Sequence, residues 1–329
     1  MSVPLIDLSA AADAVLAERI DAALREAGFF AVRGHGVPAR VVDAAFDASK
    51  RFFALAEAEK SRWHIDHWPL KRGFDPIGWQ ALDVGQPPDV KESFYTGNTS
   101  LGPNQWPDES LVPGFRVACE SYSAAMQQVA LRLMALFANA LGMASNAFDA
   151  YTRDPTCTTR LLHYPPQPVT AAPGQIGCGA HTDWGALTLL AQDDAGGLQV
   201  QRSDGSWLDI EPIHGALLVN TGDMMPRWTN DRWRSTMHRV INRGRSMGRP
   251  ENDAPPRGAG ATSGVLEASS GRDRWSIAYF FDLDPDARIA PLPVCISADN
   301  PARYAPITAG EHLIEMYRRT TVPARWTPR

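Results

Sequence analysis

The chain has 329 residues and a formal net charge of −5, from 32 basic and 37 acidic side chains. Apolar residues make up 44% of it and charged residues 21%, which is the balance of a soluble globular protein with a sizeable core. The sequence has no long basic run and no apolar window long enough to span a bilayer, so we expect no nucleic-acid and no membrane partner.

In chain order, the first part, residues 1–150, is expected to be mostly helical with a short β lead. Its predicted elements are a strand in VPLIDLS (3–9), a helix over 10–27, a glycine-bounded strand in GFFAVRGHG (28–36), a helix over 39–58 and a longer helix over 115–141. The helices are predicted from apolar residues that recur at helical spacing.

The second part, residues 151–300, changes to short β-like runs separated by turn signals such as DDAGG and SDGS. The predicted strands lie at 158–164, 186–192, 196–201, 206–210, 215–220, 238–242 and 274–283. Many short strands at this spacing indicate a β-sandwich or barrel. A last helix is predicted over 310–320, within a C-terminal helix and tail at 301–329.

A long insertion interrupts the predicted strands at residues 244–273, which are rich in Gly, Pro, Ser and Ala. This composition cannot bury enough apolar surface to fold alone, so we expect a flexible loop. Loops of this length are either functional or disordered, which leaves a lid over the site as the alternative.

The four cysteines (Cys119, Cys157, Cys178 and Cys295) stand singly, without a C-x-x-C pair, which argues against a zinc knuckle or a thioredoxin-like motif. Single scattered cysteines are typical of the reducing cytosol. The first ten residues, MSVPLIDLSA, lack the basic and apolar regions of a signal peptide. We therefore expect a cytoplasmic protein.

The pattern H-x-D, which can supply two metal ligands, occurs twice. His64 and Asp66 follow a charged stretch with helical character, and on a helix such positions do not face each other. His181 and Asp183 precede an apolar run, where a strand or its edge would place both side chains on one face, roughly 7 Å apart at the Cα atoms. The second copy is therefore the better metal site.

A metal ion needs further ligands, and the candidates for a third are His163, His214 and His238. Two histidines and one carboxylate, with open positions left over, are the ligand set of non-haem iron(II) oxygenases. A structural zinc would instead close its shell with four protein ligands. His238 begins the strand signal HRVIN, and the alternative for it is a hydrogen-bonded histidine at a strand end.

The predicted strand RWSIAYFFDL is mostly apolar but also contains Arg274. Alternation places on one face Arg274, Ser276, Ala278, Phe280 and Asp282. A guanidinium matches a carboxylate, so Arg274 and Ser276 can hold an acidic ligand if this face looks into the barrel. Tyr164, at the end of the strand 158–164, can present its hydroxyl to the same ligand. The alternatives are an internal salt bridge and a core tyrosine with a satisfied hydroxyl.

These segments together resemble the isopenicillin N synthase-like family of iron(II)- and 2-oxoglutarate-dependent dioxygenases. VPLIDLS, GFFAVRGHGVP and FFALAEAEK resemble the N-terminal region of that family, and the stretch that begins HTDWGALTLLAQDD resembles its catalytic jelly roll. RSTMHRVIN resembles the segment with the distal histidine, and RWSIAYFF fits the R-x-S element. The resemblance implies one catalytic unit over 1–329, a mainly β fold with flanking helices (α+β), and a double-stranded β-helix (jelly-roll) core over 151–300.

The resemblance also implies a site and a reaction. His181, Asp183 and His238 would bind Fe(II), and Arg274 and Ser276 would bind the distal carboxylate of the cosubstrate 2-oxoglutarate. The family often carries N-x-Y before the two prolines, where this chain has Leu162 and Tyr164; the tyrosine matches and the asparagine does not. With dioxygen, such an enzyme oxidises a small molecule by hydroxylation, desaturation or ring closure and releases succinate and carbon dioxide.

The substrate is expected at the barrel mouth, and the candidate residues indicate a small molecule with some polar or charged character. They are Phe280, Asp282, Trp184, Arg72, Phe74, Trp79 and Phe94.

Two alternative functions keep the same fold. One is an iron-dependent oxidase that does not use 2-oxoglutarate, which Leu162 favours, and the other is a non-catalytic jelly-roll protein that binds an acidic ligand. A hydrolytic metal enzyme is less favoured, because no Asp or Glu is obviously placed as a base. The sequence leaves the oligomeric state open.

Overall fold

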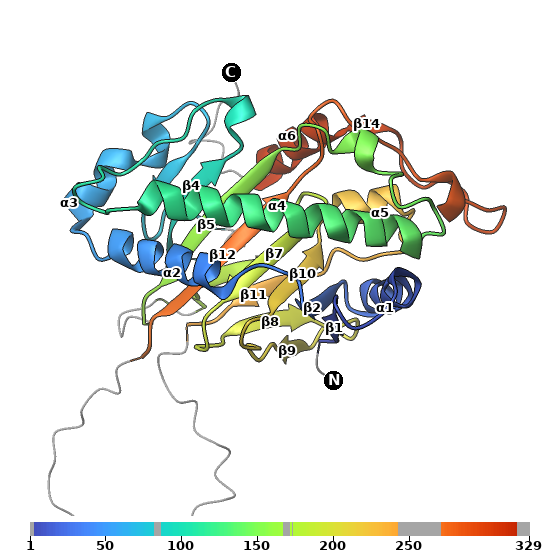
Figure 1. Ribbon diagram of the computed structural model, residues 1–329, viewed down its shortest axis with the longest axis horizontal. Helices are drawn as coiled ribbons and strands as arrows, with labels where there is room; N and C mark the ends of the chain where they lie inside the picture. The colour runs from blue at the N-terminus through green and yellow to red at the C-terminus, as the bar shows by residue number, and fades with distance from the viewer. Residues whose placement is uncertain (1–2, 82–86, 167–171, 173, 243–270, 321–329) are drawn as a thin grey trace, which may run out of the picture.

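A computed structural model describes residues 3–81, 87–166, 172, 174–242 and 271–320 (Figure 1). Its centre is an eight-stranded sheet of order β1-β2-β10-β7-β12-β5-β4-β3, which faces a four-stranded sheet of order β6-β11-β8-β9. All pairs are antiparallel except β1 with β2. Two facing antiparallel sheets are the arrangement expected of a jelly roll.

The large sheet contains β1 (Leu5–Asp7), β2 (Phe29–Arg33), β3 (Gly73–Asp75), β4 (Glu92–Gly97), β5 (Cys157–Tyr164), β7 (Leu187–Gln192), β10 (Leu217–Thr221) and β12 (Arg274–Phe281). The small sheet contains β6 (Cys178–His181), β8 (Leu198–Gln201), β9 (Trp207–Asp209) and β11 (His238–Val240). A separate hairpin joins β13 (Arg288–Ile289) to β14 (Ile307–Thr308).

The helices are α1 (Asp13–Glu26), α2 (Ala39–Phe53), α3 (Glu57–Lys60), α4 (Phe115–Ala140), α5 (Met224–Trp228) and α6 (Ala309–Thr320). The long helix α4 crosses the large sheet in Figure 1, with α2 beside it. Within the described ranges, no helix is long and apolar enough to cross a membrane.

Strand alternation divides the large sheet into two apolar faces. On β12, the side chains of Ile277, Tyr279 and Phe281 belong to the core under the helices. Ala278 belongs to a second cluster, shared with Cys178 and other residues of the small sheet. The face that carries Arg274 and Ser276 is therefore the inner face, between the two sheets, as the alternation in the sequence predicted.

Most predicted elements are present, and the differences are local. The helix predicted over 39–58 is two helices, because the chain is extended at Ala56 between α2 and α3. The short strands β3, β4, β13 and β14 were not predicted, and β6 was expected only as a strand or strand edge at His181. Of the insertion predicted at 244–273, residues 244–270 lie outside the described part of the chain, as does the tail at 321–329.

The aromatic core between the helices and the sheet makes α2 sensitive to truncation. Phe52 is fully buried, and its ring centroid lies 4.8 Å from that of Phe94 and 5.4 Å from that of Phe115. We expect Phe52→Ala to lower the free energy of unfolding by about 3–5 kcal/mol, measured by urea denaturation. Val117→Ala, at a side chain 66% exposed on α4, is the control and should change it by less than about 0.5 kcal/mol. Equal effects of the two substitutions would contradict this packing.

Candidate metal centre

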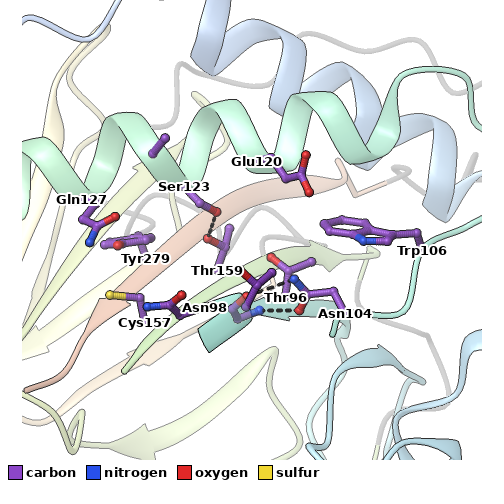
Figure 2. Close-up of a pocket in the computed structure, with 13 residues that line it drawn as sticks. Thr96, Asn98, Asn104, Trp106, Glu120, Ser123, Gln127, Cys157, Thr159 and Tyr279 are labelled. Carbon is purple, nitrogen blue, oxygen red and sulfur yellow. Dashed lines mark hydrogen bonds between the residues drawn. The ribbon is translucent and has the colours of Figure 1, made fainter. Parts of the chain in front are cut away.

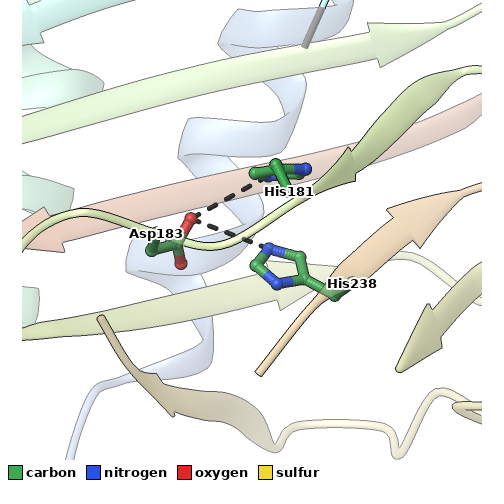
Figure 3. Close-up of side chains that lie close together, drawn as sticks. All are labelled: His181, Asp183 and His238. Atoms are coloured by element: carbon green, nitrogen blue, oxygen red, sulfur yellow. Dashed lines mark ion pairs between the residues drawn. The ribbon is translucent and has the colours of Figure 1, made fainter. Parts of the chain in front are cut away.

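Three side chains from two strands and a loop converge between the sheets (Figure 3). His181 ends β6, and His238 begins β11 directly opposite it in the antiparallel register. Asp183 follows two residues after His181. Its Oδ1 lies 3.6 Å from Nε2 of His238 and 3.9 Å from Nε2 of His181. One ligand atom from each residue fits within a 4.8 Å span, which is the size of a shared metal site.

A strand position is found for His181 but not for Asp183. His181 is the last strand residue, whereas Asp183 lies past the strand end, in the connection to β7. The carboxylate is turned toward the histidines by the loop, whose backbone is fixed where the carbonyl of Asp183 accepts the N–H of Asp223 at 2.8 Å. Loop geometry, rather than a shared strand face, brings the two ligands together.

Backbone carbonyls orient both imidazoles. Nδ1 of His181 lies 2.8 Å from the carbonyl oxygen of Gly179, and Nδ1 of His238 lies 3.0 Å from that of Thr236. A carbonyl only accepts hydrogen bonds, so each Nδ1 carries the proton and each Nε2 keeps a free lone pair. Both lone pairs are thereby available at the position that faces Asp183.

The carboxylate of Asp183 is held through one oxygen. Its Oδ2 accepts hydrogen bonds from Oγ1 of Thr188 and Nδ2 of Asn220, both at 2.6 Å. The side chain is 7% exposed, and Oδ1 is left to face the two histidines. Sequence reasoning missed Thr188 and Asn220, although each is a polar residue inside a predicted apolar strand, which is a usable signal.

The pKa shifts of His181, Asp183 and His238 favour the protonation states that bind a metal ion. Burial lowers the pKa of His181 and lowers that of His238 to about 4, where the neighbouring His181 adds to the effect. Burial opposes ionisation of Asp183, but the two histidines and the donated hydrogen bonds bring its pKa below the usual value. At neutral pH the cluster offers two neutral imidazoles and a carboxylate, the forms that bind metal.

The other histidines considered as ligands lie elsewhere. His163 points to the opposite face, with Nδ1 2.7 Å from Oε1 of Glu92 and its ring stacked on Trp275 at 4.0 Å. His214 is exposed in a turn. In the first H-x-D copy, Nδ1 of His64 accepts the backbone N–H of Asp66, so this copy forms a local turn.

Arg274 lies on the inner face as expected and is 4% exposed. Its Nη1 donates to Oγ of Ser276 at 3.0 Å, its Nε to the carbonyl of Gly196 at 2.9 Å and its Nη2 to Oε1 of Gln192 at 3.2 Å. The guanidinium lies 4.7 Å from the ring centre of Tyr164. Within the described residues no ion pair to a carboxylate is found for Arg274, so the internal salt bridge considered for it is not seen there.

The predicted substrate residues separate into two groups. Phe280 continues the Arg274 face and is half-buried, and Trp184 follows Asp183 directly. Burial and the charge of Asp183 raise the pKa of Asp282 to about 7.

The remaining candidates lie away from the cluster. Phe74 and Phe94 belong to the core under the helices, because alternation in β3 and β4 turns them to the outer face. Arg72 donates to backbone carbonyls of a surface turn, and the ring of Trp79 packs on His64. Phe74, Phe94 and Arg72 therefore do not belong to the proposed substrate site, whereas Trp79 directly precedes Gln80, which accepts a hydrogen bond from Arg160.

A cavity of about 260 Å³ lies between α4 and the outer face of the large sheet (Figure 2). It is lined by Thr96, Gly97, Asn98, Thr99, Asn104, Trp106, Glu120, Ser123, Ala124, Gln127, Cys157, Thr159 and Tyr279. Oγ of Ser123 and Oγ1 of Thr159 form a 2.6 Å hydrogen bond across it. None of the three clustered ligands lines this cavity, so it is separate from the metal centre.

Known families match both parts of the chain. The 2OG-Fe(II) oxygenase superfamily matches residues 155–283, and the family described as non-haem dioxygenase in morphine synthesis N-terminal matches residues 3–109. The 2-oxoglutarate-Fe(II) type oxidoreductase hxnY of Emericella nidulans is 35% identical over 96% of this chain and 90% of its own length. This chain belongs to the 2OG-Fe(II) oxygenase superfamily. It is a dioxygenase that uses iron(II) and 2-oxoglutarate on a small-molecule substrate.

Solved structures confirm the predicted fold of this oxygenase. A full-length Neurospora crassa protein in complex with alpha-KG superposes with a TM-score of 0.83 at 28% identity, over 97% of this chain and 96% of the other. The complex of the same Neurospora protein with alpha-KG and thymine gives 0.81 at 28% identity, over 97% of each chain. The mainly β fold with flanking helices and a double-stranded β-helix core, expected from the resemblance, is therefore confirmed.

The loop that carries Asp183 in this oxygenase depends on a glycine. A Cβ added at Gly185 would lie 1.4 Å from Oδ1 of Asp282, so the carboxyl group occupies the space of a side chain. We expect Gly185→Ala to lower the free energy of unfolding by about 1–3 kcal/mol through overpacking, measured by thermal and urea denaturation.

The matched control removes the obstructing group. In an Asp282→Ala background, the added methyl group meets no carboxylate, and Gly185→Ala should cost less than half as much. An equal cost in both backgrounds would show that the close approach to Asp282 is not what requires glycine.

Proposed function

We propose that His181, Asp183 and His238 bind the iron of this oxygenase. The observation that carries the proposal is the convergence of two unprotonated Nε2 atoms on a carboxylate oxygen that has no other partner assigned to it. Three such ligands leave positions open for a cosubstrate and dioxygen. Iron(II) bound there supplies the activation of dioxygen, coupled to conversion of 2-oxoglutarate to succinate and carbon dioxide.

We further propose that Arg274 and Ser276, packed on Tyr164, bind the distal carboxylate of 2-oxoglutarate. A buried guanidinium without a carboxylate partner among the described residues is costly, and the cosubstrate supplies that partner. Leu162, opposite Ser276 on β5, offers no hydrogen bond to the chelating end of the cosubstrate. The metal and Arg274 therefore carry most of the affinity for 2-oxoglutarate.

For the substrate we propose a small polar molecule that contacts Phe280 and Trp184. Both lie beside the ligand cluster, and the Neurospora crassa structural neighbour binds thymine together with alpha-KG. Asp282 instead packs on Gly185, and we assign it a role in holding the loop.

We also propose that the enzyme works as one catalytic unit in the cytoplasm, without nucleic-acid or membrane partners. All four cysteines are buried and unpaired, which suits a reducing compartment, and the acidic net charge disfavours polyanions. Fractionation of cells that express the tagged protein is the direct check.

We expect His181→Ala to lose iron binding and to reduce substrate-independent succinate formation by at least about 100-fold, because an intact ligand set is required. Iron content and succinate are measured after anaerobic loading with Fe(II). The control is His214→Ala, at an exposed histidine, which should retain both. Full turnover by the His181→Ala variant would contradict the assignment of His181 as an iron ligand.

We expect Arg274→Gln to raise the KM for 2-oxoglutarate by about 10- to 100-fold, which corresponds to one lost charge-assisted interaction. Iron content should be unchanged, since Arg274 does not touch the ligands. An unchanged KM would mean that the cosubstrate carboxylate binds elsewhere.

A further inference from the structure

A second buried arginine shares the inner face with Arg274. On β5, alternation places Arg160 on the same face as Leu162 and Tyr164. The register makes one row across the large sheet of Gln192, Ser276, Leu162, Ser93 and Asp75, and the next row of Leu190, Ala278, Arg160, Tyr95 and Gly73. Arg160 therefore faces the same interior as the proposed cosubstrate residues, one row away.

Two of the three nitrogens of the Arg160 guanidinium donate hydrogen bonds to protein atoms, and within the described part of the chain the third, Nη1, does not. Nε donates to Oγ of Ser93 at 3.1 Å, and Nη2 approaches Oε1 of Gln80 at 2.8 Å and Oδ2 of Asp75 at 3.3 Å. The ring of Tyr95 lies 4.5 Å below it. Among the hydrogen bonds of the described residues, Nη1 has none. The side chain is only 10% exposed, but Nη1 is not among the fully buried polar atoms that lack a partner, so this nitrogen remains accessible to a ligand.

Arg160 is close to the metal centre through Cys178. Cys178 belongs to the same apolar cluster between the sheets as Leu162 and Tyr164, which share the inner face of β5 with Arg160. Sγ of Cys178 lies 3.8 Å from Nδ1 of His181. The inner face of β5, which carries Arg160, therefore packs toward the cysteine that contacts His181, and a small molecule bound beside the iron can reach this face.

The charges around Arg160 are already balanced. Its partner Asp75 is 3% exposed, and the neighbouring buried cation Lys91 is paired with Asp89. An anionic group brought to Nη1 would meet Asp75 close by, and a cationic group would meet the guanidinium itself. An uncharged oxygen acceptor satisfies the free N–H groups without either cost.

We propose that Arg160 anchors the substrate by donating from Nη1 to an uncharged carbonyl oxygen, as found in an amide, lactam or imide. The Arg160–Tyr95 pair holds this end of the molecule on the sheet, while the carbon to be oxidised lies toward the iron. This inference rests on the proposed iron and cosubstrate site and adds the chemical class of the substrate.

The test uses the Fe(II)-loaded full chain and measures succinate formation with and without probe compounds. The uncharged carbonyl probes are benzamide, 2-pyrrolidinone and thymine, and their matched counterparts are benzoate, benzylamine and pyrrolidine. We expect at least one carbonyl probe to raise succinate formation above the substrate-independent rate and its counterparts not to do so.

The arginine is then varied. Arg160→Gln should reduce the stimulated rate, or raise the KM for the probe, by at least about tenfold, as for one lost hydrogen bond from a charged donor. Arg160→Lys keeps the charge beside Asp75 but loses the planar fork, so it should also lose at least about fivefold. The control is Arg227→Gln, at an arginine on α5 whose guanidinium lies 5.2 Å from the ring centre of Tyr304.

The substrate-independent rate separates the two proposals. All four proteins should show the same substrate-independent succinate formation and the same KM for 2-oxoglutarate, which also shows that they are folded. Absence of that rate in the wild type would contradict the proposed function and this inference with it. With that rate intact, the inference alone is overturned if no carbonyl probe stimulates, if benzoate or an amine stimulates as strongly, or if stimulation survives in both Arg160 variants.

Discussion

Two hydrogen bonds to one oxygen of a buried carboxylate determine the centre of this oxygenase. Thr188 on β7 and Asn220 on β10 hold Oδ2 of Asp183, and they are direct partners in the antiparallel register. The pairing of two strands in the large sheet thus decides which oxygen faces the histidines. A shift of one residue in that register would place the two donors on opposite faces of the sheet, so that at most one of them could still hold the carboxylate.

The small sheet supplies the other half of the centre. His181 and His238 face each other across β6 and β11, and each is oriented by a carbonyl two residues before it in the chain. Because the carboxylate is fixed by one sheet and the imidazoles by the other, the centre exists only when the sheets pack together. The apolar cluster between them, which includes Cys178 and Leu218, therefore supports the chemistry as well as the fold.

The sequence predicted those features that depend on alternation within one strand. The inner face of β12 follows from period two alone, which is why Arg274 and Ser276 were placed correctly. The same rule placed Asp183 on one strand face with His181, which is wrong because Asp183 lies in a loop. Phe74 and Phe94 were wrongly proposed as substrate residues, because their strands were not predicted and the sequence alone does not show which face of a strand meets the helices.

The other features that the sequence did not predict depend on pairing between strands that are far apart in the chain. β3 and β6 have only three and four residues, too few for a periodic pattern, and they form through their neighbours rather than through propensity. Arg160 was visible beside Tyr164 on a predicted strand, but its partners Ser93 and Asp75 come from β4 and β3. Without the register, nothing in the sequence joins these residues into one cluster.

The most direct measurement is a crystal structure of the enzyme grown anaerobically with Mn(II) and 2-oxoglutarate, with the metal located by anomalous scattering. This account predicts one ion within about 2.3 Å of Nε2 of His181, Nε2 of His238 and Oδ1 of Asp183. The distal carboxylate of the cosubstrate would lie on Arg274, and Oδ2 of Asp183 would stay bonded to Thr188 and Asn220. An ion bound at other residues, or through Oδ2 with both of those hydrogen bonds broken, would contradict it.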